Sequence, residues 1–423
     1  MIAIALALLA AGRVLTLDEA VQAARERQPQ LRQARANTEA AGARAQQSFA
    51  PLLPQVTAIA GYQRTTANGI NRPGSGTAAG GNGSSWDTVN SFTDSIQASQ
   101  LIFDFGAGTN RWRSAKALAD AQAANERAVV LQVDYNVRAA YFDTRANQAL
   151  VQVARENLEN QERHLAQTEG FVQAGTRADI DLIQARTDTA NARVTLINAQ
   201  NAFQTSKITL NAAMGVQGPT DYDVADVQQP PVAGEDAGLD PLLEEASAAR
   251  PEVKSLEEQI RAEQLTVRSI QGQYGPAISA TAGFQQGGTS LDNLGWNAAV
   301  GLSLSWNIFQ GGLTKAQVSE AQANVMAAVA QLDLQRQQIR SDVDGARLAV
   351  RAAKESLSAT RDALVNARER LRLAEERYQV GVGSAIELGD AQVALTTAEA
   401  QTVQADDRLS TARAQLLRAL GRQ

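Results

Sequence analysis

The sequence contains an internal duplication, and this repeat constrains the fold more than any single motif does. Ala60-Gly-Tyr-Gln63 in the first half corresponds to Ala282-Gly-Phe-Gln285 in the second half. Pro29 corresponds to Pro251, and the two are separated by the same number of residues as the preceding pair. Beyond one glycine-rich segment the offset changes once and then holds to the end of the chain. Because the length change is confined to one loop, we expect two copies of one structural repeat.

Each half is expected to form a helix, a strand, a loop, a strand, a very long helix, a tight turn and a return helix. The first repeat is expected at residues 13–215, the inter-repeat linker at 216–238 and the second repeat at 239–423. The first repeat has strands at about 55–65 and 92–103, a long helix at about 107–172 and a return helix at about 179–214. The second has strands at about 277–286 and 295–308, a long helix at about 313–378 and a return helix at about 385–420. Residues 66–91 are rich in Gly, Asn, Ser and Thr, so we expect an exposed loop there.

The strand segments alternate apolar residues with small or polar ones at period two. The clearest apolar set is Trp296, Ala298, Val300, Leu302, Leu304, Trp306 and Ile308. Such alternation fits a soluble sheet with a core on one side, or a membrane sheet between lipid and a water-filled lumen. The tryptophans at both ends of the set favour the membrane alternative. Asp94, on the corresponding face of the first half, argues mildly against it.

The helices carry their own start signals and a sustained heptad. Thr16 and Glu19 have the spacing of a capping box, and Pro29 and Pro251 are each expected to begin a second helical segment. Between 313 and 378 apolar and small residues recur at alternating spacings of four and three without a break. This period of about 3.5 residues specifies left-handed supercoiled packing, so the sequence predicts antiparallel coiled-coil hairpins.

Residues 1–12 are apolar and end in small side chains, a pattern typical of a signal peptide or its remnant, although a basic n-region is missing. This stretch is shorter than the roughly 20 residues that a membrane-spanning helix needs. No other segment approaches that length, so entry into a membrane would require a closed β-barrel.

Several function classes are disfavoured by residue types that the chain lacks. It contains one His and no Cys. The absence of Cys excludes disulfides and thiolate metal sites. No phosphate-binding glycine-rich loop or cluster of metal ligands is present, so we expect neither an enzyme nor a cofactor. His164 lies in a polar run within a helix and is expected to be a surface residue. A net charge of −6 argues against nucleic acid as the main partner.

The duplicated order of elements resembles the TolC-like outer-membrane efflux family over nearly the whole chain. The motifs that carry the resemblance are the two strand-to-helix junctions, Gln100–Gly106 and Ser305–Gly312, and the two hairpin tips, Phe171–Leu182 and Tyr378–Leu388. The resemblance implies a homotrimer in which each protomer gives four strands to a 12-stranded β-barrel, set in outer-membrane lipid, on a 12-helix α-barrel that extends into the periplasm. Four strands cannot close alone, and an open edge in lipid is untenable, which supports this assembly independently.

The resemblance also implies a passive export duct of a tripartite efflux or type I secretion system. In the family, a periplasmic adaptor and an inner-membrane transporter open the periplasmic tip, where acidic residues line the constriction. The matching positions are Glu387 and Asp390, spaced so that they share a helical face, and in the first half Asp181, which Arg177 nearby could pair with. Six carboxylates in a trimer would favour cations. Alternatively, carboxylates in a first helical turn complement the helix dipole.

The adaptor-facing tips implied by the resemblance are Ala174, Gly175 and Thr176, and Val380, Gly381 and Val382. Glycine there also serves as a left-handed helix C-cap. A periplasmic adaptor or a structural coiled-coil protein is the alternative function. Adaptors of that kind carry one hairpin flanked by β-rich domains, whereas this chain has two hairpins in repeat order. The sequence does not identify the exported substrate.

Overall fold

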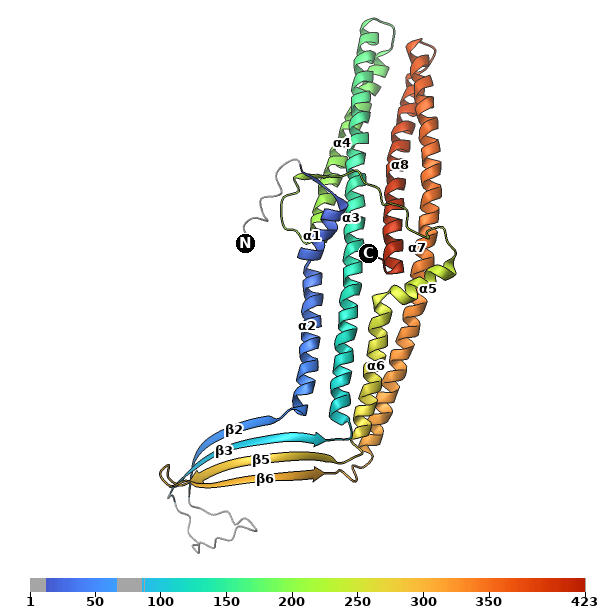
Figure 1. The fold of residues 1–423 in the computed structure, drawn as a ribbon. Helices are drawn as coiled ribbons and strands as arrows, with labels where there is room; N and C mark the ends of the chain where they lie inside the picture. The colour runs from blue at the N-terminus through green and yellow to red at the C-terminus, as the bar shows by residue number, and fades with distance from the viewer. Residues whose placement is uncertain (1–12, 67–85, 87, 423) are drawn as a thin grey trace. The chain divides into compact units, whose positions relative to one another are not determined.

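The computed structural model of the chain (Figure 1) describes residues 13–66, 86 and 88–422. The expected signal segment 1–12 and most of the expected long loop lie outside these residues. The described chain forms two compact units. The helical unit contains residues 13–38, Gln122–Ser255 and 331–422, and the sheet unit contains the described parts of Glu39–Ala121 and Leu256–Ala330. Each unit draws on both halves of the sequence.

The elements follow the expected order, with two short strands added. The helices are α1 (Leu17–Arg27), α2 (Pro29–Phe49), a short 3-10 helix η1 (Ala50–Leu52), α3 (Ala107–Gln173), α4 (Asp179–Met214), α5 (Leu239–Ala249), α6 (Pro251–Gly272), α7 (Leu313–Gln379) and α8 (Ala385–Leu420). The strands are β1 (Arg13–Leu15), β2 (Gln55–Thr66), β3 (Thr88–Phe103), β4 (Tyr222–Val224), β5 (Ala277–Gly288) and β6 (Gly295–Ser305). α3 and α7 both have 67 residues, and α4 and α8 both have 36, so the corresponding hairpins of the two halves match in length.

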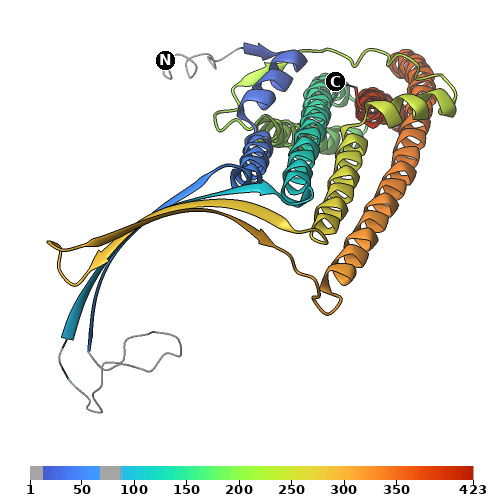
Figure 2. The same cartoon turned by 60° about the horizontal axis from the view of Figure 1, so that its bottom comes forward.

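The sheet unit holds one antiparallel sheet in the order β2-β3-β5-β6. β2 and β6 are the edge strands of this sheet. Each half of the sequence supplies one strand pair, and β3 and β5 join the two pairs. The sheet is curved along its strands, as Figure 2 shows. Since β2 and β6 each pair on one side only, their outer backbone groups lack strand partners within the described sheet.

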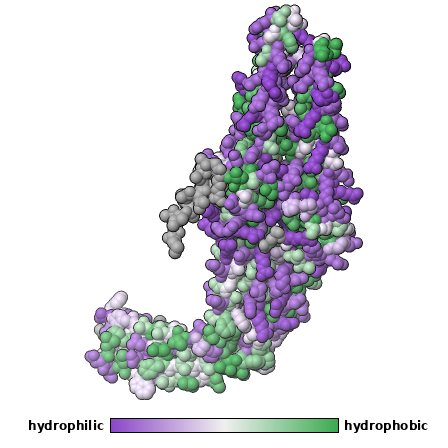
Figure 3. Space-filling view, turned by 45° about the horizontal axis from the view of Figure 1, so that its top comes forward, coloured by the Kyte–Doolittle hydropathy of each residue, from purple (hydrophilic) through white to green (hydrophobic). Residues whose placement is uncertain are grey.

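The apolar alternation of the separate strands becomes one continuous face of this sheet. Val56 pairs with Ala98, Ala98 with Ala282, and Ala282 with Val300, so one row of apolar side chains crosses all four strands. Val56 is 68% and Val300 88% exposed. Figure 3 shows hydrophobic side chains gathered over the strands. Asp94 lies on the same face, where the Gln286 side-chain amide donates to its carboxylate at 3.4 Å.

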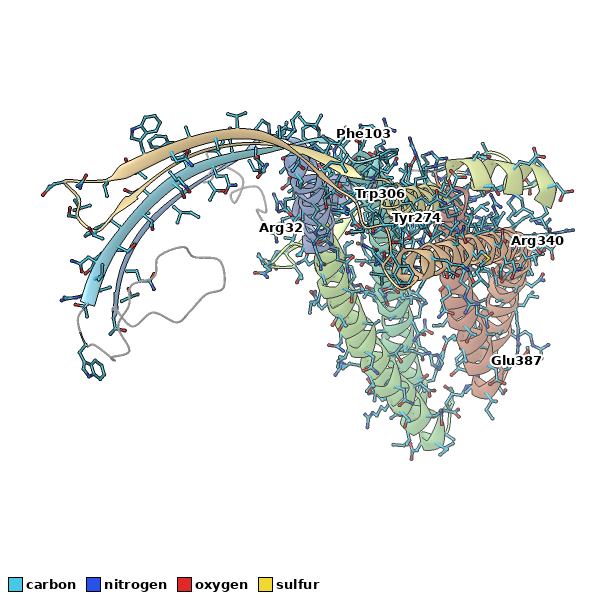
Figure 4. The ribbon with its side chains drawn as sticks, turned by 90° about the horizontal axis from the view of Figure 1, so that it is seen from below. Arg32, Phe103, Tyr274, Trp306, Arg340 and Glu387 are labelled. Carbon is cyan, nitrogen blue, oxygen red and sulfur yellow. The ribbon has the colours of Figure 1, made fainter. Side chains whose placement is uncertain are left out.

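Two strand ends differ from the expected ones. β3 begins at Thr88, four residues before the expected start, because Thr88–Ser91 pair with the polar end of β2 although they carry no apolar alternation. β6 ends at Ser305, before the expected end at Ile308. There the indole N–H of Trp306 donates to the carbonyl of Tyr274 at 3.1 Å, so Trp306 binds the loop that precedes β5 instead of continuing the ladder (Figure 4).

The helix signals are confirmed. The Thr16 hydroxyl accepts from the Glu19 N–H, and the Glu19 carboxylate accepts from the Thr16 N–H, both at 3.3 Å. α2 begins at Pro29 and α6 at Pro251. The heptad of α7 is buried at Leu332, Ile339, Val343, Ala346, Val350, Ala353, Leu357, Ala367, Ala374 and Tyr378. Arg336 on the same register is exposed and pairs with Asp333 at 3.6 Å, because a guanidinium keeps its charge in water.

The core of the helical unit packs around Tyr141 and Phe142, whose rings meet edge to face at 5.8 Å. The Tyr141 hydroxyl lies 2.9 Å from the Ala225 carbonyl and 3.1 Å from the Leu15 carbonyl. Leu15 is the last residue of β1, and Ala225 directly follows β4. The two strands pair in parallel. The aromatic core therefore anchors the segment between the two halves to the N-terminal strand.

Candidate functional site: the hairpin tips

Two tight turns form the tips of the long hairpins in the helical unit. α3 ends at Gln173 and α4 begins at Asp179, while α7 ends at Gln379 and α8 begins at Ala385 (Figure 1). Gly175 and Gly381 close the first helix of each hairpin with φ of 72° and 79°. Only glycine adopts this left-handed conformation without strain, so both residues are the C-caps that the sequence predicted.

Arg177 joins the first tip to the second hairpin. Its guanidinium carbon lies 4.4 Å from the centre of the Tyr378 ring, and its Nη2 donates to the Gly383 carbonyl at 3.4 Å. The described protomer shows no ion pair within 4.0 Å between Arg177 and Asp181, and the possible pairing of these two residues stays a prediction. The long arginine side chain reaches a buried aromatic face on the neighbouring hairpin, where cation–π attraction and a carbonyl acceptor combine.

Tyr378 is the centre of an aromatic cluster between the hairpins. It is 3% exposed, and the rings of His164 and Phe171 meet it at 5.4 and 6.3 Å. His164 was expected at the surface, and the structure shows it half-buried. Its Nδ1 is buried without a hydrogen-bond partner among the described residues, and burial lowers the pKa of the imidazole, against the opposing charges of Asp188 and Asp181. The polar run around His164 concealed this contact, because the partner ring comes from the other half of the sequence.

Gly383 allows the second tip to fold closely against the end of α7. A Cβ at this position would lie 2.9 Å from the backbone nitrogen of Tyr378, which is closer than real Cβ atoms approach. The Val382 and Gly383 N–H groups both donate to the Arg377 carbonyl, at 3.1 and 2.9 Å. Glycine at 383 thus presents the carbonyl that Arg177 binds, a role that the sequence did not reveal.

Two further hydrogen bonds connect the hairpins behind the tips. The Gln161 side chain of α3 donates to the Gln392 side chain of α8 at 3.0 Å in a buried position. Thr396 of α8 donates to Asn157 of α3 at 3.2 Å. The two links lie about one helical turn apart along both α3 and α8.

The predicted gate carboxylates lie in two different surroundings. Asp181 and Asp390 line one groove of about 640 Å³ between α3, α4 and α8, together with Asp188. Glu387 does not line this groove. It pairs with Arg377 of its own hairpin at 3.3 Å, and its N–H donates to the Ser384 hydroxyl, the N-cap of α8, at 3.1 Å (Glu387 is labelled in Figure 4). Glu387 and Asp181 both occupy first helical turns, as the dipole alternative requires.

The six residues expected to face an adaptor lie at the tips, and all six are solvent-exposed. Val380 is 72% and Val382 70% exposed, while the Thr176 hydroxyl donates back to the Phe171 carbonyl at 2.9 Å. None of the helices in the described ranges combines the length and apolar character needed to cross a bilayer. The described side chains also bring together no group of three or more His, Asp or Glu that could hold a metal ion.

Two clusters of charged side chains in the helical unit were not predicted from the sequence. The Glu235 carboxylate accepts two hydrogen bonds from the Arg413 guanidinium, both at 3.0 Å. It also forms an ion pair with Lys354 at 2.7 Å. Arg145 pairs with Asp226 at 2.6 Å and with Asp406 at 2.7 Å. These clusters connect the segment that follows β4 to α3, α7 and α8. Their residues are far apart in the sequence and carry no motif.

Comparison with known proteins supports the same family throughout. The profile of the family described as outer membrane efflux protein matches residues 20–216 and 242–422. The solvent efflux pump outer membrane protein SrpC of Pseudomonas putida is 28% identical over 311 residues, which cover 70% of this chain and 63% of SrpC. The chain therefore aligns with less than two thirds of that relative's length. The outer membrane protein TolC of Escherichia coli (strain K12) is 28% identical over 423 residues, covering 92% of this chain and 78% of TolC.

Solved structures share the fold at low sequence identity. The outer membrane protein VceC of Vibrio cholerae superimposes with a TM-score of 0.80 at 20% identity, over 96% of each chain. The outer membrane channel CmeC of Campylobacter jejuni gives a TM-score of 0.82 at 18% identity, over 96% of this chain and 85% of CmeC. The fold is thus that of the outer-membrane efflux channels, and by the extent of the profile match the chain belongs to the outer membrane efflux protein family.

Proposed function

We propose that this chain is one protomer of a passive outer-membrane export duct, the channel component of a tripartite efflux or type I secretion system. The observation that carries the proposal is the sheet. It has a continuous, strongly exposed apolar face across four strands and two edge strands, β2 and β6. An apolar face of this extent needs a cover, and lipid is the cover that the family's location supplies.

The two sheet edges support a trimer. Outer-membrane barrels leave no strand edge in lipid, because unpaired backbone groups there cost several kcal/mol each. Pairing β6 of one protomer with β2 of the next satisfies both edges, and three protomers of four strands close a 12-stranded barrel. The long hairpins of α3, α4, α7 and α8 would then form a 12-helix α-barrel that extends into the periplasm.

The tips are the proposed end at which partners open the duct. Val380 and Val382 offer exposed apolar side chains to a periplasmic adaptor protein, which would act with an inner-membrane transporter. Asp390 and Glu387 of three protomers would place six carboxylates near the mouth, with Asp181 sharing the Asp390 groove. The contact of Arg177 with Tyr378 would hold the two hairpins of each protomer together in the resting state.

Membrane extraction and mass distinguish this proposal from its alternative. The full-length protein should remain in the outer-membrane fraction after a salt wash, dissolve only with detergent, and run as a trimer in analytical ultracentrifugation. A periplasmic adaptor or a structural coiled-coil protein would be released without detergent as an elongated oligomer. Reconstituted into planar bilayers, the trimer should conduct ions, whereas a protein that never forms pores would refute the duct.

A further inference from the structure

A groove of about 600 Å³ lies between the first turns of α3 and the last turns of α6, within the sheet unit. Its walls are held by short contacts between these two helices. The Ser114 hydroxyl donates to the Ala262 carbonyl at 2.9 Å, and the Ser269 hydroxyl to the Ala107 carbonyl at 2.7 Å. The groove is therefore a built feature of one compact unit, and nothing in the duct function uses it.

The side chains that line the groove are strongly basic. They include Arg113, Lys116, Arg261 and Arg268, the aromatic Trp112 and one carboxylate, Asp120. Four cations against one carboxylate leave an excess of three positive charges, in a chain whose net charge is −6. Such a local reversal of sign attracts anions.

Most of this charge has no counter-ion within the protomer. Arg261 pairs with Glu258 at 3.4 Å. For Arg113, Lys116 and Arg268, the described part of the chain provides no ion pair within 4.0 Å. By contrast, Arg145 in the helical unit pairs with both Asp226 and Asp406. Three uncompensated cations around one concave surface indicate an anionic ligand from outside the chain.

The groove lies next to the end of the sheet where the aromatic side chains gather. β3 ends at Phe103 and α3 begins at Ala107, so Trp112 and Arg113 lie about 8–9 Å along α3 from its first residue. The Trp112 ring packs on Phe49 at 5.0 Å, and Phe103 on Phe105 at 4.9 Å. Figure 4 labels Phe103, Tyr274 and Trp306 around this junction. An apolar face, then aromatic rings, then basic side chains is the order found at a membrane–water interface.

We propose that this groove binds the phosphate-bearing headgroup of an anionic phospholipid from the periplasmic leaflet, an inference that rests on the proposed outer-membrane duct. Guanidinium groups bind phosphate oxygens in paired hydrogen bonds, and the lysine adds a point charge. Trp112 lines the same groove, and its indole would contact the glycerol and upper acyl region of the bound lipid. The hydroxyls of a glycerol headgroup can donate to Asp120. A zwitterionic choline headgroup offers the same phosphate, but its cation meets three uncompensated positive charges.

The test compares lipid selectivity in two charge-matched variants. The full-length protein is exchanged into nanodiscs of equal phosphatidylglycerol and phosphatidylcholine with the same acyl chains, and the lipid that stays bound after delipidation is measured by mass spectrometry. The groove variant is Arg113→Gln/Lys116→Gln/Arg268→Gln. The control variant is Arg361→Gln/Arg370→Gln/Arg408→Gln, which removes the same charge from exposed positions of the helical unit. The groove variant should lose at least about fivefold in phosphatidylglycerol preference, the effect of removing one interfacial cation, and the control variant should keep it.

A second arm of the experiment adds excess inorganic phosphate, because the free anion offers the same oxygens to the groove as a lipid headgroup does. If phosphate binds the wild type but phosphatidylglycerol is not enriched over phosphatidylcholine, the groove is an anion site and the lipid proposal is overturned. Equal loss in both variants, or no loss in either, overturns it too. Bilayer conductance of the same preparations separates the two hypotheses. Pores without lipid preference remove only the groove proposal, whereas a wild type without pores removes the duct.

Discussion

The guanidinium of Arg177 stacks on the ring of Tyr378, 4.4 Å from its centre, and this contact joins the tips of the two hairpins within one protomer. If the contact holds the resting tip together, Arg177→Ala should open the channel more often. Cation–π contacts are worth about 0.5–2 kcal/mol, so a rise in open probability of roughly two- to thirtyfold is expected in single-channel recordings.

Arg186→Ala is the matched control for that measurement. Arg186 belongs to the same hairpin and pairs with Glu169 at 3.3 Å, both within the first half. Removing it takes away the same charge without touching the second hairpin, so its open probability should stay at the wild-type value. An Arg177→Ala channel that behaves like the control would remove the proposed role of this contact.

The Tyr378 hydroxyl gives a prediction of the opposite kind. It is buried and finds no hydrogen-bond partner among the described residues of the protomer. An unsatisfied buried hydroxyl costs about 1–3 kcal/mol, so Tyr378→Phe should leave the midpoint of thermal unfolding unchanged or raise it. Tyr378→Ala should lower it, because it also removes the ring that Arg177 and His164 contact. A lower midpoint in Tyr378→Phe would mean that the hydroxyl has a partner in the assembled trimer.

Asp407 is expected to destabilise the folded state at neutral pH. Burial first, and then the nearby charge of Asp143, raise its pKa from 3.8 to about 6. A carboxylate whose pKa is higher in the folded state makes stability fall as pH rises from about 4 to about 6. Asp407→Asn should therefore raise the free energy of unfolding by about 1–2 kcal/mol at pH 7.5, after allowance for partial solvent screening.

The same substitution should bring almost no gain at pH 4, where the folded wild type is already protonated at Asp407. Asp406→Asn is the informative neighbour, since Asp406 accepts from Arg145 at 2.7 Å and from Gln228 at 2.8 Å. That variant should lose stability at pH 7.5. Equal effects of the two substitutions in thermal unfolding would contradict the assignment.

Glu235 is expected to make the helical unit sensitive to acid. Its side chain is 4% exposed. Burial alone would raise its pKa, but the hydrogen bonds from Arg413, Lys354 and the Val232 N–H outweigh burial and lower it. The stability from these contacts is present above the ordinary pKa of 4.5 and is lost as pH falls through the lowered value.

Glu235→Gln should cost about 1–3 kcal/mol at pH 7, because the half-buried Arg413 and Lys354 both lose the carboxylate that they share. The variant should also lose part of the wild type's steep acid unfolding below about pH 4. Asp236→Asn is the control, since Asp236 is 85% exposed and shares only Lys354. A Glu235→Gln protein with the wild-type acid profile would show that other carboxylates set the acid limit.

The regular elements could be predicted because their residues repeat at the period of a helix or a strand over many turns. The buried positions from Leu332 to Tyr378 follow the heptad, and the row from Val56 to Val300 follows the alternation. β1 and β4 could not be predicted. Three residues carry no readable period, and the pairing of Val14 with Asp223 joins distant segments.

The residues of the candidate site could be placed at the tips, but their partners could not be chosen. Arg177 and Asp181 are one helical turn apart in the sequence, which suggested a local pair. The guanidinium instead contacts Tyr378 and Gly383 from the other half of the chain. The contact of His164 with Tyr378 was missed for the same reason. A sequence period shows which face of a helix is buried, but not which distant side chain it meets.

The central claim is a duct whose mouth is ringed by carboxylates, and the reversal potential of single channels in a salt gradient tests it most directly. Wild type, Glu387→Gln/Asp390→Asn and the control Glu355→Gln/Asp362→Asn would be compared in planar bilayers. We expect a cation-selective wild type, a double variant at the tip with reduced selectivity and higher conductance, and a control like the wild type. Pores whose selectivity and conductance are unchanged in the tip variant would contradict the gate, and the absence of pores in all three would contradict the duct.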